Sequence, residues 1–251
     1  MKNRFAAIIQ ARYSDKQFAK DYYSRSKSGL KPYESVLVEK YLKNCREVLV
    51  VGCGCGRETV PLALKGFNIT AIDISKEMVN YTKYLCSEFK TKAKAYVMDA
   101  ANLKFKDNSF DAVLLFNCLI DQVPSHENRK KVCNELWRVL KPNGICIAVS
   151  NNALYPGKGL CYWREHVKEI PSFIAHWRER DFFDRIYEDG TKVYVHLSTP
   201  FYLRQLFKKG FRILNLTSTE SILSQKKGIT RYFAPNIVII LLKRGTQNAN
   251  L

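Results

Sequence analysis

Runs of apolar residues, each followed by a polar segment that suits a helix, recur along the first 150 residues. The run Val48–Val51 is apolar throughout and leads into a glycine-rich stretch, which predicts a short strand buried on both faces. The same criteria predict six further strands, at Phe67–Asp73, Ala95–Met98, Ser109–Asn117, Ile145–Val149, Phe211–Thr217 and Ile237–Lys243.

Helices are predicted between these strands. They cover Glu34–Leu42, Glu58–Lys65, Lys76–Phe89 and a segment from Thr199-Pro200 to Lys209, where proline stands at the first helical position and Gly210 ends the helix. Five strands that alternate with helices, followed by a hairpin-like pair, predict an α/β fold. We expect a doubly wound, seven-stranded, mostly parallel sheet with an antiparallel C-terminal strand, so that the final pair of strands forms an antiparallel edge.

The chain has the size and composition of one domain. Its 251 residues are 46% hydrophobic, and they contain no low-complexity run and no internal repeat. We therefore expect a single domain over residues 1–251 with one insertion. No stretch of eighteen apolar residues and no signal-peptide core is present, so we expect no membrane span and a cytoplasmic location.

Three glycines at alternate positions follow the first predicted strand. Gly52, Gly54 and Gly56 allow positive φ angles and close contact with a ligand, so they predict a nucleotide-like ligand against the backbone. The dinucleotide fingerprint would need glycine at position 57, where this chain has Arg57. Cys53 and Cys55 lack the spacing of zinc or redox sites, so we predict no metal and assign both cysteines to packing of the loop.

Acidic residues stand at the ends of the next two predicted strands. Asp73 follows the glycines by about twenty residues, where a carboxylate can accept hydrogen bonds from both hydroxyls of a ribose. Alternatively Asp73 only caps the following helix, as Ser75 could equally do. Asp99-Ala100 ends the third strand.

These motifs together resemble the class I S-adenosylmethionine-dependent methyltransferases. Val48–Glu58 is similar to motif I of that family. The F-D-x-V pattern that begins at Phe110 is similar to the family's fourth strand, and Leu140-Lys-Pro-Asn-Gly is similar to its L-K-P-G-G turn. Asn143 replaces a glycine there and tolerates left-handed φ. The resemblance implies a Rossmann-like methyltransferase fold and S-adenosylmethionine as cofactor. The implied cofactor-binding residues are Gly52, Cys53, Gly54, Gly56, Asp73, Ile74, Asp99, Ala100, Asn117, Leu119 and Tyr22.

Two regions lie outside the core that the resemblance requires. The N-terminal segment 1–45 contains Tyr22, which by resemblance would close over the cofactor; the alternative is a surface helix whose tyrosines pack onto the sheet. The insertion at about 151–197 holds nine aromatic residues and is the expected substrate cap. Its aromatic residues could also stack on bases or simply form the core of the insertion.

Methyl transfer depends mainly on holding the acceptor in line with the methyl group, and a general base is needed only where the acceptor carries a proton. The candidates for that base are His166, His176 and His196 in or beside the insertion, with Tyr22 and Asp121 behind them. None has a diagnostic context. His126 follows Pro124-Ser125 and is interpreted as a helix-start residue.

The formal net charge of +18 raises the alternative of an RNA or tRNA methyltransferase. The lysines are dispersed along the chain, so we predict a small-molecule acceptor, methylated at oxygen or nitrogen. A non-catalytic S-adenosylmethionine-binding protein is a further alternative, and a nicotinamide oxidoreductase ranks behind all of these. The sequence predicts neither the identity of the acceptor nor the oligomeric state.

Overall fold

A seven-stranded sheet forms the centre of the protein. The computed structural model describes residues 11–153, 155, 183–186, 192–225, 228, 232 and 234–244, with the backbone alone for 183–186 and 192–195. The strand order is β3-β2-β1-β4-β5-β9-β8. The strands are β1 (Glu47–Val51), β2 (Asn68–Asp73), β3 (Lys94–Val97), β4 (Phe110–Leu115), β5 (Leu140–Asn151), β8 (Phe211–Ser218) and β9 (Asn236–Lys243).

Strand β9 alone in this sheet runs against its neighbours. It pairs antiparallel with both β5 and β8, whereas β1 to β5 pair in parallel. The expected seven-stranded, mostly parallel sheet with an antiparallel C-terminal strand is confirmed, and that strand, β9, lies beside the edge strand β8. The apolar residues of β9 are almost all buried, which suits an interior strand, whereas β8 exposes alternate residues and forms the edge.

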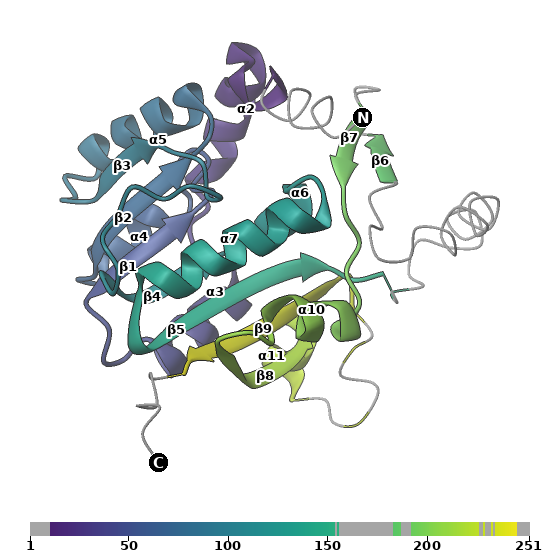
Figure 1. Cartoon of the computed structure of the whole chain (residues 1–251). Helices are drawn as coiled ribbons and strands as arrows, with labels where there is room; N and C mark the ends of the chain where they lie inside the picture. Colours follow the sequence, from purple (N-terminus) through teal and green to yellow (C-terminus); the bar gives the residue numbers. More distant parts are fainter. Residues whose placement is uncertain are drawn as a thin grey trace.

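Helices cover both faces of the sheet. Helix α7 (His126–Val139) lies in front of it in Figure 1 and α3 (Pro32–Tyr41) lies behind. Along β1, Leu49 and Val51 join the core beneath α7 and α10 (Pro200–Phe207). Val48 and Val50 join the other core, with residues of α3, α4 (Thr59–Leu64) and α5 (Lys76–Glu88). Alternate side chains of Val48–Val51 therefore pack into the two hydrophobic cores on opposite faces of the sheet, as expected for a strand buried on both faces.

The predicted helix boundaries agree with the structure to within a few residues. The Ser75 hydroxyl caps α5 and the Thr199 hydroxyl caps α10, each by accepting a backbone N–H three residues ahead. Asn143 has a φ of 61°, as its place in the predicted turn requires. Helices α2 (Lys16–Ser26), α6 (Leu119–Gln122) and α11 (Thr219–Ser224) are also present.

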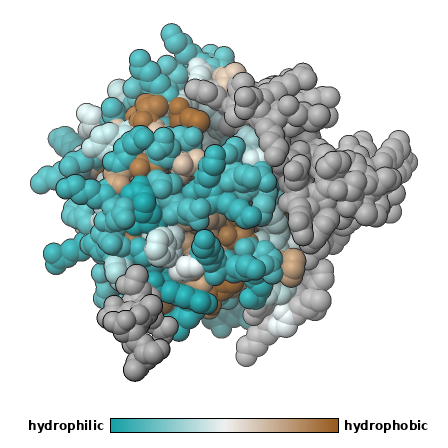
Figure 2. All heavy atoms as spheres, in the orientation of Figure 1, coloured by the Kyte–Doolittle hydropathy of each residue, from teal (hydrophilic) through white to brown (hydrophobic). Residues whose placement is uncertain are grey.

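The expected insertion lies partly outside the described residues. Its two ends are joined, because the Ala153 N–H donates to the Ser198 carbonyl and the Ser198 N–H donates to the Asn151 carbonyl. Between them, β6 (Phe183–Ile186) and β7 (Lys192–Val195) form an antiparallel pair. No helix among the described residues is long and apolar enough to cross a membrane. The face seen in Figure 2 is largely hydrophilic, with separate apolar patches.

Two glycines with similar φ angles test how tightly the chain at Gly210 packs against Trp137 of α7. Gly210 has a φ of 83°, and a Cβ there would lie 2.6 Å from the Trp137 ring, whereas Gly66, at 92°, has open space. We expect Gly66→Ala to lower the free energy of unfolding by about 1 to 2 kcal/mol, through backbone strain alone. Gly210→Ala should cost about 1 to 3 kcal/mol more, because the added methyl group overpacks the site. Urea denaturation measures both; equal losses would contradict the packing argument.

Candidate active site

A cavity of about 480 Å³ opens at the carboxyl ends of the parallel strands, where ligands of such sheets bind. Most residues that the sequence assigned to the cofactor line it. They are Tyr22, Gly52, Gly54, Asp73, Ile74, Asp99, Ala100, Asn117 and Leu119. These residues come from α2 and from the segments that follow β1, β2, β3 and β4, so the sheet brings together positions almost a hundred residues apart.

Two assigned residues of the glycine loop do not line the cavity. Cys53 is buried and belongs to the core on the α3 side of the sheet. Gly56 faces α5, where a Cβ would lie 3.3 Å from the Thr82 Cα. The Cys55 thiol is also buried and lies 3.4 Å from the Met78 sulfur. Both cysteines therefore pack the loop, in line with the assignment made from their spacing.

The sequence reasoning missed one wall of the cavity. Gln122 and Val123 close α6, Pro124 follows them, and Asn128 and Lys131 come from the first turns of α7. The Pro124-Ser125 helix start marked this segment, but no residue in it carries a binding motif. The position of this segment depends on β4, because β4 ends beside the cavity shortly before α6 begins.

The glycine loop fits closely against its neighbours. Gly52 and Gly54 have φ angles of 73° and 52°, which residues with a side chain rarely adopt. A Cβ on Gly52 would lie 2.6 Å from the Leu119 Cδ1 atom, and one on Gly54 would lie 3.0 Å from the Tyr22 ring. The positive φ angles therefore favour glycine at both positions, and a side chain there would also have to displace Leu119 or Tyr22.

Asp73 connects the glycine loop to the start of α5. Its Oδ2 atom accepts the Gly54 N–H at 3.0 Å, and its Oδ1 atom accepts the Ser75 N–H at 2.9 Å. Because the Ser75 hydroxyl caps α5, Asp73 is not the helix cap. Burial raises the pKa of Asp73, and the backbone hydrogen bonds partly offset that effect. Each carboxylate oxygen keeps a further lone pair for a ligand.

Tyr22 extends from α2 over the glycine loop. Helix α2 begins at the Asp15 cap, and the Tyr22 ring lies where it would contact any side chain at Gly54. Burial raises the pKa of the Tyr22 hydroxyl, with a further contribution from the charge of Glu58. The phenol is therefore neutral at physiological pH, so it can donate a hydrogen bond and is a poor general base.

A buried cluster of charged side chains lies beside Asn117. Arg57 forms a two-pronged ion pair with Glu34, with distances of 2.7 and 2.8 Å, and also contacts Glu58. Burial raises the pKa of Glu58 to about 7, although the charge of Arg57 opposes the shift. The Asn117 amide donates to Glu58 at 2.8 Å and accepts from Arg57 and Lys31, each at 3.1 Å.

Among the described residues, the candidate general bases do not gather at the cavity. His196 is buried beside Tyr202, with 4.6 Å between the ring centroids, and is not among the residues that line the cavity. His126 is the first residue of α7, as interpreted, and lies 3.1 Å from the Tyr202 hydroxyl. His166 and His176 lie outside the described residues. Of the candidate bases in the described part of the chain, Tyr22 alone lines the cavity.

Asp121 is buried and does not line the cavity, and its side chain forms hydrogen bonds at both ends of the expected insertion. Its carboxylate accepts from the Ser150 and Ser198 hydroxyls at 2.6 and 3.1 Å. It also accepts from the backbone and side-chain N–H groups of Asn151, at 2.5 and 3.0 Å. The Asp121 carbonyl accepts the His196 N–H. This arrangement gives Asp121 a structural role.

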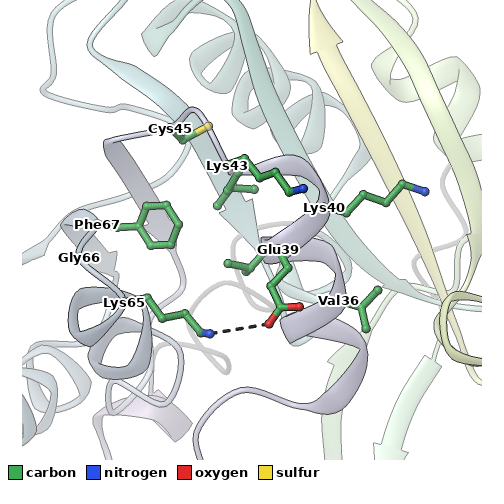
Figure 3. Close-up of a pocket in the computed structure, with 10 residues that line it drawn as sticks. Val36, Glu39, Lys40, Lys43, Cys45, Lys65, Gly66 and Phe67 are labelled. Atoms are coloured by element: carbon green, nitrogen blue, oxygen red, sulfur yellow. Dashed lines mark ion pairs between the residues drawn. The ribbon is translucent and has the colours of Figure 1, made fainter.

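A second hollow, of about 890 Å³, lies between α3 and the start of β2 (Figure 3). It contains none of the residues assigned to the cofactor. Lys40, Lys43 and Lys65 line it, and Lys65 forms an exposed ion pair with Glu39 at 3.9 Å. It lies near the amino ends of the strands, so it is not where the sheet places a ligand.

Comparisons with known proteins agree with this geometry. A family model described as a methyltransferase domain matches residues 48–144. An uncharacterised protein of Methanocaldococcus jannaschii is 36% identical over 174 residues, which cover 69% of this chain and 67% of that protein. A demethylmenaquinone methyltransferase of Tropheryma whipplei is 36% identical over 98 residues, which cover 39% of this chain and 38% of that enzyme.

A solved structure extends the similarity over most of the chain. An S-adenosylmethionine-dependent methyltransferase of Methanosarcina mazei superposes with a TM-score of 0.67 and 26% identity, and the match covers 86% of this chain and 99% of that one. The chain belongs to the class I S-adenosylmethionine-dependent methyltransferases. Its cofactor is S-adenosylmethionine.

The buried Asp121 predicts a pH dependence of stability. Burial raises the pKa of Asp121 to about 7, so the folded state binds this proton more tightly than the unfolded state. The stability that Asp121 contributes is therefore complete below its unfolded pKa and is lost as the pH rises through about 7.

We expect Asp121→Asn to destabilise the protein more at about pH 5 than at about pH 8, because the ionised wild-type side chain is already unfavourable at the higher pH. Urea denaturation at both pH values measures the difference. Ser150→Ala serves as the control, since it removes a hydrogen bond to Asp121 without removing its titratable group. A difference that grows with pH would show that the Asp121 pKa is lowered in the folded state.

Proposed function

We propose that this chain transfers the methyl group of S-adenosylmethionine to an oxygen or nitrogen atom of a small molecule. The supporting observation is the single cavity that holds the glycine loop, Asp73, Asp99 and Asn117 together. Its volume of about 480 Å³ is within the usual range for small-molecule pockets. The Tropheryma whipplei relative is, by its name, a demethylmenaquinone methyltransferase, which is consistent with a small acceptor.

The cofactor residues divide along the cavity. In this proposal the Asp73 carboxylate accepts hydrogen bonds from the ribose hydroxyls, since its two backbone hydrogen bonds leave lone pairs available. Asp99 and Ala100, which also line the cavity, would contact the adenine. Gly52, Gly54 and Asn117 would contact the methionine part, and Leu119 lies beside Gly52. Ile74, which is 42% exposed, offers an apolar edge to the base.

The bound cofactor supplies an electrophilic methyl group on a positively charged sulfur. The chain has to hold the acceptor in line with that methyl group and exclude water, and such positioning can supply roughly 7 to 11 kcal/mol of the barrier. Tyr22 would close the cavity from α2, and the insertion at about 151–197 would cover the acceptor. A neutral oxygen or nitrogen acceptor also has to lose a proton, and we assign no residue to that step.

The charges that line the cavity favour a small molecule over RNA. Among the described lining residues there are two acids, Asp73 and Asp99, and one cation, Lys131. A site that guides a polyanion to the methyl group would be expected to present several cations around its mouth. The net charge of +18 is therefore carried mostly outside this cavity.

Calorimetric titration with S-adenosylhomocysteine tests the cofactor site. We expect micromolar binding to the wild type and at least about tenfold weaker binding to Asp73→Ala, because hydrogen bonds to a charged group are lost. Asp107→Ala is the matched control, since Asp107 is an exposed acid that pairs with Arg138 outside the cavity. Absence of binding to the wild type, or equal binding to Asp73→Ala, would contradict the assignment.

Incubation of the protein with methyl-labelled S-adenosylmethionine and size-fractionated cell extract tests the acceptor class. We expect label in the low-mass fraction, unchanged by nuclease or protease treatment of the extract. Label that nuclease removes would establish the RNA alternative. Tight cofactor binding without labelled product in any fraction would favour the non-catalytic binding protein.

A further inference from the structure

Arg57 occupies the position at which the glycine loop departs from the dinucleotide fingerprint, and its side chain is 9% exposed. We propose that Arg57 is a positioning residue. Its guanidinium fixes the side-chain amide of Asn117, a residue that lines the cavity, together with the turn between α2 and α3, in the arrangement that receives the methionine part of the cofactor. This inference rests on the proposed function, because it concerns the same cavity.

The guanidinium of Arg57 joins four parts of the chain. Its Nη1 atom donates to the Gly29 carbonyl at 2.8 Å and to Glu34 at 2.7 Å. Its Nη2 atom donates to Glu34 at 2.8 Å, to Glu58, and to the Asn117 side-chain oxygen at 3.1 Å. Nη1 and Nη2 carry four hydrogens for these five contacts, so one hydrogen of Nη2 is shared, and the single ammonium of a lysine could make fewer of them.

Glu34 carries the connection from Arg57 into α3. Its carboxylate also accepts the Lys31 N–H at 2.7 Å, which caps the first turn of that helix. Glu34 is fully buried. Arg57 therefore holds the Gly29–Lys31 turn from both sides, through the Gly29 carbonyl and through Glu34. That turn directly follows α2, the helix that places Tyr22 over the cavity.

Asn117 is held at both ends of its amide group. The oxygen accepts from Arg57 and Lys31, and the nitrogen donates to Glu58 at 2.8 Å. These partners also fix which way the amide faces, because a flipped group would place its nitrogen against two cations. The backbone of Asn117 has a left-handed φ of 54°, which asparagine tolerates. The cluster thus sets the orientation of a side chain that lines the cavity.

The buried carboxylates of this cluster depend on the nearby cations for their stability. Arg57 and Lys31 face Glu34 and Glu58, with the Tyr22 and Tyr33 hydroxyls nearby. Removing Arg57 would leave two buried carboxylates without their main partner, which is strongly unfavourable. Asn117 both lines the cavity and accepts a hydrogen bond from Arg57, so it is the direct route by which a change at Arg57 reaches the cofactor.

A double-mutant cycle in S-adenosylhomocysteine affinity tests the proposal. Arg57→Lys keeps the charge and removes the fork, and Asn117→Gly removes the amide while permitting the left-handed φ. We expect each variant to bind at least about tenfold more weakly than the wild type, and the double variant to bind no more than about twofold more weakly than the poorer single variant. Losses that multiply would show that the two residues act independently, and would overturn the proposal.

Arg138→Lys is the matched control. Arg138 forms the same two-pronged pair with a glutamate, Glu135, at 2.9 and 2.8 Å, and none of its partners lines the cavity. We expect the affinity of the Arg138→Lys variant for S-adenosylhomocysteine to stay within about twofold of that of the wild type, although the variant is less stable. An equal loss of affinity in Arg57→Lys and Arg138→Lys would assign the effect to general stability and refute the positioning role.

Lys31→Ala keeps the proposal testable if Arg57→Lys does not fold. Lys31 is exposed and reaches the Asn117 oxygen from the outside of the cluster, so its loss should not prevent folding. We expect affinity about threefold to tenfold weaker, and no change would count against the proposal. If the wild type itself fails to bind S-adenosylhomocysteine, the proposed function fails. If it binds but the cycle is additive, the positioning role alone fails.

Discussion

The parallel pairing of β1 with β2 and β4 is the constraint on which the rest of the structure depends. Val48 and Val50 of β1 stand opposite Ile69 and Ala71 of β2, and also opposite Ala112 and Leu114 of β4. Because parallel strands end at the same edge, this register places the segments after all three strands side by side. Gly52, Asp73 and Asn117 become neighbours only through it. The buried apolar side chains stabilise the sheet, and the polar ends of the strands form the cavity.

Polar side chains then fasten the loops that the sheet brings together. Asp73 binds the backbone of the glycine loop, and Arg57 connects that loop to Asn117 and to the turn before α3. On the other side of the cavity, Asp121 binds the residues that enter and leave the insertion. A buried polar group is costly unless it is hydrogen-bonded, so each of these side chains favours one arrangement of its loops. The cavity is thus surrounded by loops whose positions are set by internal hydrogen bonds.

The sequence determined the seven strands of the sheet, the approximate boundaries of four helices and nine of the residues that line the cavity. Apolar runs, capping serines and glycines are local signals, and the motif spacing placed Gly52, Gly54, Asp73 and Asp99 correctly at strand ends. Tertiary structure decided what local signals could not. Strand β9 lies between β5 and β8 because strand order depends on contacts between distant segments, and the Gln122–Lys131 wall reaches the cavity because β4 delivers it there. The roles of Asp121 and Arg57 also depend on partners far along the chain, such as Ser198 and Glu34, which no periodicity could pair with them.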